Sequence, residues 1–440
     1  MKSSPFQTII LVIFVVAFGI AIVAFSGILS SNTATTATTE LSGEVVIWGV
    51  LPSEPMQLYV NDVNGGSNKY SLVYEEHDPA TFYTDLITAI ADGRQPDVVL
   101  ASSEIISQFS DKLYTTPYAA YSERGFRDTN IDGAQIFLSA EGVQAFPLVV
   151  DPLVVYYNKD LLAARNFVVP PGTWEDLVKS VPFFVRRDAQ NIITQSAIGL
   201  GGTSNITHYR DILSALFLQT GNTIMTVDMV TKQQRSTLAE GANQSVEGGR
   251  LPTAQALEFY TGFADPTNRS YSWNRSLQSD LQVFLAGKSA FYIGRASDLF
   301  AIQSQNPNLN FDVSLFFQPT AAVRPITFGS FIAAGVLKSA PNFPAAYDAV
   351  SQFATADAVD RLSKRLSVPP VRRDLLLVAQ QNPYVSVFFR AATGAFAWPD
   401  PNAVATADIF RAMITSVTSG AANADTAIYD ASRNLQSNTR

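Results

Sequence analysis

The sequence of 440 residues contains no cysteine. This absence excludes disulfide bonds, thiolate metal sites, a cysteine nucleophile and a lipid-modified N-terminal cysteine. Histidine is nearly absent as well, because His77 and His208 are the only two. A histidine-rich metal site is therefore excluded, and we expect no metal and no cofactor. Burial of apolar side chains must hold the folded chain together.

Basic residues are in the minority and do not cluster. The chain has 30 Lys and Arg against 38 Asp and Glu, which gives a net charge of −8. Nucleic-acid binding depends on clustered Lys and Arg that neutralise phosphates, so we expect no nucleic-acid partner. The hydrophobic fraction of 47% with 15% charged residues predicts a folded chain. Its length predicts two globular units.

The longest apolar run is residues 7–29, which carry no charge. A helix of that length spans roughly 30 Å of hydrocarbon at about 1.5 Å per residue. We expect a retained, single transmembrane helix at the cell membrane. Because Lys2 lies in the short end before it, residues 1–6 should be cytoplasmic and the bulk of the chain extracytoplasmic. The alternative is a cleaved signal peptide, since residues 24–26 (AFS) offer small side chains for cleavage.

Structured elements are predicted to begin after residues 30–43. This stretch is rich in Ser and Thr, which is typical of a flexible linker. A helix should start at Asp78 and Pro79, an N-cap and first-turn pair, and end at Gly93. Buried strands are expected on either side of it, at 44–48, 69–74 and 98–100. This alternation of strand and helix is typical of a parallel sheet in an α/β fold.

The same alternation continues downstream. Thr173 and Asp176 form a pattern like a capping box, which predicts a helix start. Further strands are expected at 153–157, 197–200 and 289–293, and further helices at 212–220, 281–286, 345–353 and 409–417. The glycines at 199–202 lack a following Walker lysine, so this loop is interpreted as a turn and not a phosphate cradle. The polar tract 233–249 has no assignment.

Two polar groups are expected at the edge of the predicted sheet. Ser53 and Glu54 follow the first strand, and Ser102, Ser103 and Glu104 follow the strand at 98–100. In a parallel α/β sheet, ligands bind beyond the carboxyl ends of the strands, so both groups are candidate ligand contacts. The alternative is that these hydroxyls and carboxylates only cap helices.

Five segments resemble the family 1 extracellular solute-binding proteins, the group that includes the maltose-binding protein. They occur in the order that this family shows, and they extend over most of the chain from residue 44. The segments are TAIADGRQPDVVL (88–100), FPLVVDPLVVYYNKDLL (146–162), PPGTWEDL (170–177), FLAGKSAFYIG (284–294) and SVPPVRRDLL (367–376). Each is weak alone, but five in order are a specific signal.

The resemblance implies two discontinuous α/β lobes joined by a hinge, with a solute held in the cleft between them. We expect the first lobe at 44–149 and 289–330, and the second at 150–288 and 331–440. The resemblance also implies a monomeric receptor that delivers its solute, sugar-like by preference, to the permease subunits of an ABC importer. Asp151 occupies the acidic position where sugar-binding relatives contact hydroxyls, although Asp151 and Pro152 can also be a simple hinge turn.

Aromatic side chains in loops are further candidates, because sugar rings stack on them. Trp398 and Trp273 lie in irregular stretches and are predicted ligand contacts, with Tyr384 as a weaker candidate. Trp48 and Trp174 are expected in the core. No catalytic signature is present, so an enzyme is not expected. Two alternatives stay open: an anchored surface sensor or adhesin that reuses the fold, and a glycosidase whose two carboxylates meet only in the folded chain.

Overall fold

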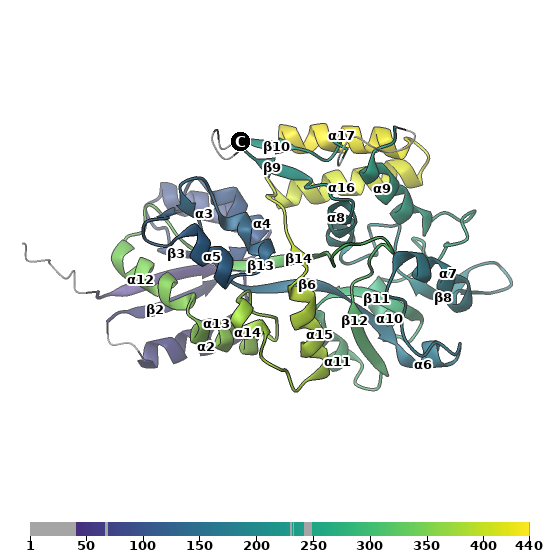
Figure 1. Ribbon diagram of the computed structural model, residues 1–440, viewed down its shortest axis with the longest axis horizontal. Coiled ribbons are helices and arrows are strands. Elements are labelled where there is room, and N and C mark those ends of the chain that lie inside the picture. The colour runs from purple at the N-terminus through teal and green to yellow at the C-terminus, as the bar shows by residue number, and fades with distance from the viewer. Residues whose placement is uncertain (1–40, 67–68, 229–230, 232, 242–248, 440) are drawn as a thin grey trace, which may run out of the picture.

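The computed structural model describes residues 41–66, 69–228, 231, 233–241 and 249–439. The predicted transmembrane helix and nearly all of the predicted linker lie outside the described residues. Within the described residues, no helix is long and apolar enough to cross a membrane. The described chain is a mixed α/β fold of two lobes, with one long sheet running through both (Figure 1).

The sheet has ten strands, and β6 (Phe146–Asn158) is the strand that both lobes share. The first half of β6 pairs antiparallel with β13 (Thr327–Val336), and its second half pairs with β11 (Ser289–Arg295) and β12 (Phe311–Leu315). β13 and most of β6 are buried. Their near-continuous apolar sequences are typical of strands that are covered on both faces.

Lobe 1 surrounds the sheet portion β2-β1-β3-β13 and has a core on each face. Alternate residues of β1 point to opposite faces: Val45 and Ile47 enter one core, and Trp48 packs against the other. Its further elements are β1 (Glu44–Gly49), α2 (Ser53–Gly66), β2 (Ser71–Glu76), α3 (Phe82–Ala91), β3 (Val98–Ser102), α4 (Ser103–Ile106), η1 (Ser107–Phe109), β4 (Thr116–Pro117), α5 (Glu123–Thr129), η2 (Asp132–Phe137), β5 (Gly142–Val143), α12 (Phe343–Phe353), α13 (Ala356–Leu366) and α14 (Arg373–Leu376).

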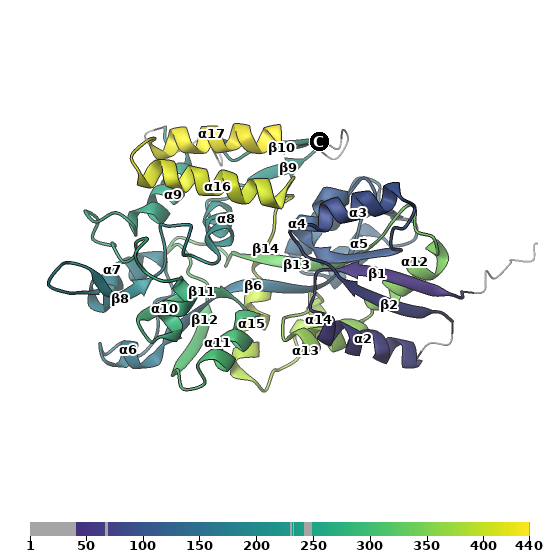
Figure 2. The ribbon, with the colours of Figure 1, turned by 180° about the vertical axis from the view of Figure 1, so that it is seen from behind.

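Lobe 2 contains the largest core cluster, which the C-terminal helices help to form. Figure 2 shows these two helices running side by side over α8. Its further elements are α6 (Lys159–Ala163), α7 (Trp174–Phe184), β7 (Arg186–Arg187), β8 (Ile193–Ile198), α8 (Tyr209–Gln219), β9 (Met225–Val227), β10 (Gln234–Ser236), α9 (Pro252–Gly262), α10 (Asp280–Leu285), α11 (Asp298–Gln305), α15 (Pro383–Ala392), α16 (Ala403–Thr418) and α17 (Ala424–Ser437).

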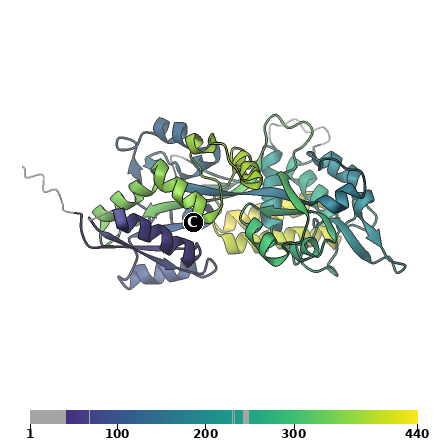
Figure 3. The same cartoon turned by 90° about the horizontal axis from the view of Figure 1, so that it is seen from below.

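The chain passes between the lobes along β6, along β13 and through residues 377–382, which link α14 to α15. Seen from below, the molecule is elongated and the two lobes meet at these crossings (Figure 3). The short strand β14 (Ala395–Phe396) returns to the junction and pairs with the start of β13. Gly133 allows this close approach, because a Cβ there would lie only 2.1 Å from the carbonyl oxygen of Ala395.

Two sequence predictions differ from the structure. The predicted helix start at Asp78 is wrong, because Asp78 and Pro79 form a turn and α3 begins at Phe82 with Thr81 as its N-cap residue. The packing also places some segments in a different lobe from the one that the predicted ranges give them. The predicted lobe ranges themselves stay a prediction. β11 and β12 pair with the second half of β6 and lie in lobe 2, whereas α12 and α13 pack with β1 in lobe 1.

Candidate functional site

The carboxyl ends of β1 and β2 place polar groups at the edge of lobe 1. The backbone N–H and the hydroxyl of Ser53 both donate to one carboxylate oxygen of Glu76, at 2.7 and 2.6 Å. These two hydrogen bonds lower the pKa of Glu76. Glu54 lies in the first turn of α2 and is exposed. Trp48, expected in the core, is only half-buried, and its ring stacks on His77 with centroids 3.9 Å apart.

The turn from β3 into α4 contributes a buried carboxylate. Glu104 is only 5% exposed. Its Oε2 accepts hydrogen bonds from the hydroxyls of Ser103 and Ser330, both at 3.2 Å, and Ser330 belongs to the crossing strand β13. Ser102 ends β3 at the N-cap position of α4, and its side chain makes no capping hydrogen bond. Glu104 therefore reaches the junction of the lobes, where Ser330 helps to hold it.

Lobe 2 contributes a network of charged side chains, which come from the start of α8, the end of β11 and the start of α11. Nε and Nη2 of Arg295 both donate to Asp211 Oδ2, at 2.9 and 2.7 Å. His208 lies between two carboxylates, with Nε2 2.9 Å from Asp298 and Nδ1 3.6 Å from Asp211. Burial lowers the pKa of His208, but the hydrogen bonds to both carboxylates outweigh burial and raise it to about 9. His208 is therefore charged at neutral pH.

Arg210 joins this network from the first turn of α8. Its guanidinium forms an ion pair with the buried Asp400 and lies 5.9 Å from the ring centroid of Trp398. Its Nε is covered by protein atoms and has no hydrogen-bond partner among the described residues. A buried donor without a partner costs about 1–3 kcal/mol.

Glu104 of lobe 1 faces the two arginines of lobe 2. Burial opposes the charged form of each arginine. The pKa of Arg210 is nevertheless raised by the charges of Asp400 and Glu104, and that of Arg295 by Asp211, Asp151 and Glu104. Within the described part of the chain, however, Glu104 forms no ion pair within 4.0 Å. The carboxylate is thus near enough to act on both guanidinium groups without touching either.

Asp151 lies in the middle of β6, where it pairs with Ser330 in the register of β13. Its carboxylate accepts the backbone N–H of Ser297 at 3.0 Å and the hydroxyl of Ser297 at 2.6 Å. Burial raises the pKa of Asp151, although Arg295 and Ser297 oppose that rise. The structure thus brings together two of the predicted residues, Asp151 and Glu104, through β13 and Arg295.

The predicted aromatic contacts are not exposed platforms. Trp398 is 2% exposed, donates from Nε1 to the Ser214 hydroxyl and stacks on Phe410. Trp273 is fully buried and donates to Asn205. Tyr384 is half-buried on α15, and its ring stacks on Phe311 in a different core cluster. Their predicted contact with a solute stays a prediction.

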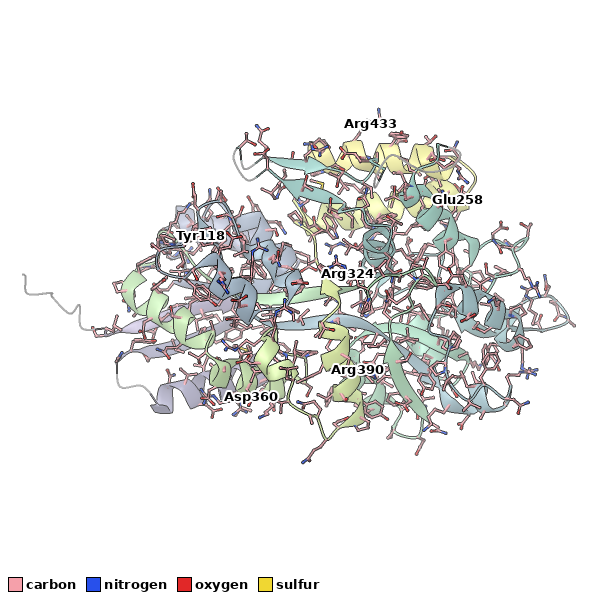
Figure 4. The ribbon with its side chains drawn as sticks, in the orientation of Figure 1. Tyr118, Glu258, Arg324, Asp360, Arg390 and Arg433 are labelled. Carbon is pink, nitrogen blue, oxygen red and sulfur yellow. The ribbon has the colours of Figure 1, made fainter. Side chains whose placement is uncertain are left out.

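Two adjoining cavities lie between the lobes. The first, of about 470 Å³, is lined in lobe 1 by η1 residues and by residues on either side of β5, and in lobe 2 by Val227, Asp228 and Gln234 of the β9 and β10 region. The second, of about 490 Å³, is lined by η2, the end of α8 and the segment 396–399. Arg324, labelled near the centre of Figure 4, lines the second cavity and lies over the ring of Phe396 at 4.9 Å.

Sequence reasoning missed most of the charged network. Arg210 and Asp211 follow the glycine-rich loop at 199–202, and Arg295 ends β11, just after the predicted strand at 289–293. The signal available was their position: each charged group lies where a strand ends or a helix begins, at the edge of a parallel sheet. Among the described residues, no group of His, Asp or Glu is arranged to hold a metal ion.

The sequence of the chain matches a known family. The model of the bacterial extracellular solute-binding proteins matches residues 60–386. The chain belongs to this family. It is therefore a solute-binding protein and not an enzyme, and its folded part is extracytoplasmic.

Solved structures with the same fold include three sugar-binding proteins. The GacH receptor of Streptomyces glaucescens is 17% identical, with a TM-score of 0.68, and the match covers 91% of this chain and 99% of that one. The cyclic α-maltosyl-1,6-maltose binding protein of Arthrobacter globiformis is 17% identical, with a TM-score of 0.71 and coverages of 90% and 98%. The maltose/maltodextrin-binding domain MalE of Bdellovibrio bacteriovorus is 11% identical, with a TM-score of 0.66 and coverages of 90% and 99%. At these identities the likeness shows the fold.

Proposed function

We propose that this chain is the receptor of an ABC importer, and that it captures a neutral sugar or oligosaccharide between its lobes and delivers it to the permease subunits. The observation that carries the proposal is that Glu104 of lobe 1 acts on the charges of Arg210 and Arg295 of lobe 2 and forms no ion pair with either among the described residues. A sugar hydroxyl both donates and accepts hydrogen bonds. It can donate to the Glu104 carboxylate and accept from the Arg210 guanidinium, whose side chain is 16% exposed, and so join the lobes through the solute.

The charges at the junction support a neutral solute over an anionic one. The carboxylates Glu104, Asp151, Asp211, Asp298 and Asp400 face the three cations His208, Arg210 and Arg295. The carboxylates outnumber these cations, so further negative charge is unfavourable here. The structural neighbours were solved with acarbose and maltotriose, among other saccharides.

A thermal-shift screen tests this proposal. A solute that binds only the folded chain raises stability by RT ln(1 + [L]/Kd), which is about 2.7 kcal/mol at 100 times Kd. We expect stabilisation by at least one neutral saccharide and none by the matching uronic acid. Stabilisation by anionic sugars alone, or by no sugar in a library of mono- and oligosaccharides, would contradict the proposal.

A further inference from the structure

Exposed apolar side chains gather at the outer end of lobe 2. Val168 and Val169, in the loop between α6 and α7, are 97% and 69% exposed, and Phe183, in the last turn of α7, is 55% exposed. The rings of Phe167 and Phe183 meet edge to face with centroids 5.8 Å apart, so the loop and the end of the helix form one surface. The β7–β8 hairpin follows α7 directly, and Ile192 in its turn is also exposed. Exposed apolar side chains that gather in this way mark an interaction site.

Arginines without ion-pair partners lie around these apolar side chains. Most Lys and Arg side chains of the described chain pair with a carboxylate within 4.0 Å. Within the described residues, five arginines of lobe 2 form no such pair, and all but the first are exposed: Arg165, Arg186, Arg187, Arg269 and Arg275. Arg165 precedes the exposed valines in the same loop, and Arg186 and Arg187 form β7.

The remaining two arginines belong to a segment that packs beside this hairpin. The guanidinium of Arg187 lies over the ring of Tyr271 at 4.8 Å, and the side-chain amide of Asn274 donates to the hydroxyl of Tyr271 at 2.9 Å. Arg275 follows Asn274 in the chain, and Arg269 lies two residues before Tyr271. We call the surface formed by residues 165–169, the end of α7, the β7–β8 hairpin and residues 269–275 the tip.

The tip combines cations with apolar surface in a chain whose net charge is −8. Asp188 is the only carboxylate of the hairpin, and its Oδ1 accepts the backbone N–H groups of Gln190 and Ile192, both at 2.9 Å. It pairs with none of the arginines. An anionic lipid surface is complementary to such a group, because its phosphates attract guanidinium groups and its interface takes up apolar side chains.

The position of the tip relative to the predicted anchor favours a lipid surface over an acidic protein. Figure 2 shows β1 at one end of the molecule and α7 and β8 at the opposite end. Residues 30–40 separate the apolar run 7–29 from Leu41, and even fully extended they span at most about 40 Å. The predicted anchor would therefore keep a membrane within reach of the folded chain.

We propose that the tip binds an anionic membrane surface, with Val168, Val169 and Phe183 inserted at the level of the head groups and the arginines on the lipid phosphates. Held by the anchor beyond lobe 1 and by the tip of lobe 2, the receptor lies with its long axis along the membrane. This inference goes beyond the proposed function, because it does not depend on which solute is bound.

The absence of cysteine allows a direct test, since a single Val168→Cys variant carries one fluorescent label at the tip. The full chain is reconstituted in phosphatidylcholine vesicles with and without phosphatidylglycerol, an anionic lipid, and with lipids that carry a nitroxide quencher at the head group. We expect the label at position 168 to be quenched when phosphatidylglycerol is present. Val404→Cys, which labels an exposed valine at the start of α16, is the matched control and should stay unquenched.

Charge substitutions test the part of the arginines in the same assay. Arg186→Gln and Arg275→Gln should each lower the ratio of bound to unbound tip about 5-fold, the effect of one cation near an anionic surface. Both side chains are exposed and unpaired among the described residues, so the fold should be unaffected. Arg390→Gln on α15, labelled in Figure 4, is the matched control: this arginine is also exposed and forms no ion pair in the described part of the chain, and its loss should change nothing.

The outcomes distinguish the tip from the anchor and from the solute site. Absence of quenching at position 168 overturns the inference and favours an acidic protein as the partner of the tip. Equal quenching at positions 168 and 404, or equal quenching with and without phosphatidylglycerol, also overturns it. Flotation on purely neutral vesicles tests the anchor alone, so a chain that fails to float there but is quenched at position 168 on anionic vesicles refutes the anchor and supports the tip. The sugar screen decides the proposed function independently.

Discussion

Replacing His208 by glutamine should remove most of the pH dependence of stability between pH 6 and pH 9.5. Burial lowers the pKa of this imidazole in the folded chain, but the hydrogen bonds to Asp211 and Asp298 outweigh burial and raise it to about 9. In the unfolded chain its ordinary pKa is 6.5. The folded state therefore binds the proton of His208 more tightly than the unfolded state does.

The size of the effect follows from these two values. At about 1.36 kcal/mol for each pKa unit, the difference between about 9 and 6.5 corresponds to about 3 kcal/mol of stability. Because the folded pKa is the higher one, this stabilisation is fully present below pH 6.5 and is lost as the pH rises through 9. The imidazole is largely buried, with 13% of its side chain exposed, so solvent screening reduces this stabilisation only slightly.

Urea unfolding of a version of the chain that begins at Leu41 measures the effect. The wild type should lose about 3 kcal/mol between pH 6 and pH 9.5, and His208→Gln should lose much less. The window ends at pH 9.5, below the ordinary tyrosine pKa of 10, because burial raises the pKa of Tyr156 and Tyr260 in the folded chain and unfolding at higher pH would release their protons. His77→Gln is the matched control and should keep the wild-type loss. An equal loss in His208→Gln and wild type would refute the reasoning.

Three further predictions concern the anchor, the core and the site. The full chain should fractionate with membranes and the version from Leu41 should be soluble, whereas a mature product that begins near residue 30 would show a cleaved signal instead. Trp398→Ala should destabilise the fold by about 3–5 kcal/mol in urea unfolding, since its ring is 2% exposed; an unchanged midpoint would place the ring outside the core. Glu104→Gln should weaken sugar binding about 10-fold in calorimetry, because a charge-assisted hydrogen bond becomes a neutral one. Glu44→Gln, an exposed carboxylate at the start of β1, is the control and should not weaken binding, and equal affinities in both variants would remove Glu104 from the site.

Local structure could be predicted wherever short-range chemistry decides it. Thr173 caps α7 by accepting the N–H of Asp176, as its sequence pattern indicates. Trp174 is buried, as predicted. Gly287 follows α10 with a positive φ, at the predicted helix end. The start of α3 was misplaced because Asp78 is equally suited to a turn and to an N-cap, and sequence alone does not choose between them.

The site could be predicted only in part, because its members come from distant segments. Glu104 and Asp151 were found from the edge of the sheet and from the resemblance. Arg210 and Arg295 were not, because 85 residues separate them and only the pairing of β11 with β6 and β8 brings them together. Trp398 is a predicted solute contact because its segment is irregular, and that contact stays a prediction. The chain there lies under Arg210 and against Phe410, so irregular backbone is buried in this protein.

The most direct test of the account is a crystal structure of the version from Leu41 with the saccharide that binds it best. The account predicts a sugar between the lobes, with one hydroxyl within hydrogen-bond distance of both the Glu104 carboxylate and the Arg210 guanidinium. A saccharide bound to one lobe only, or a direct ion pair between Glu104 and Arg210 in the complex, would contradict it.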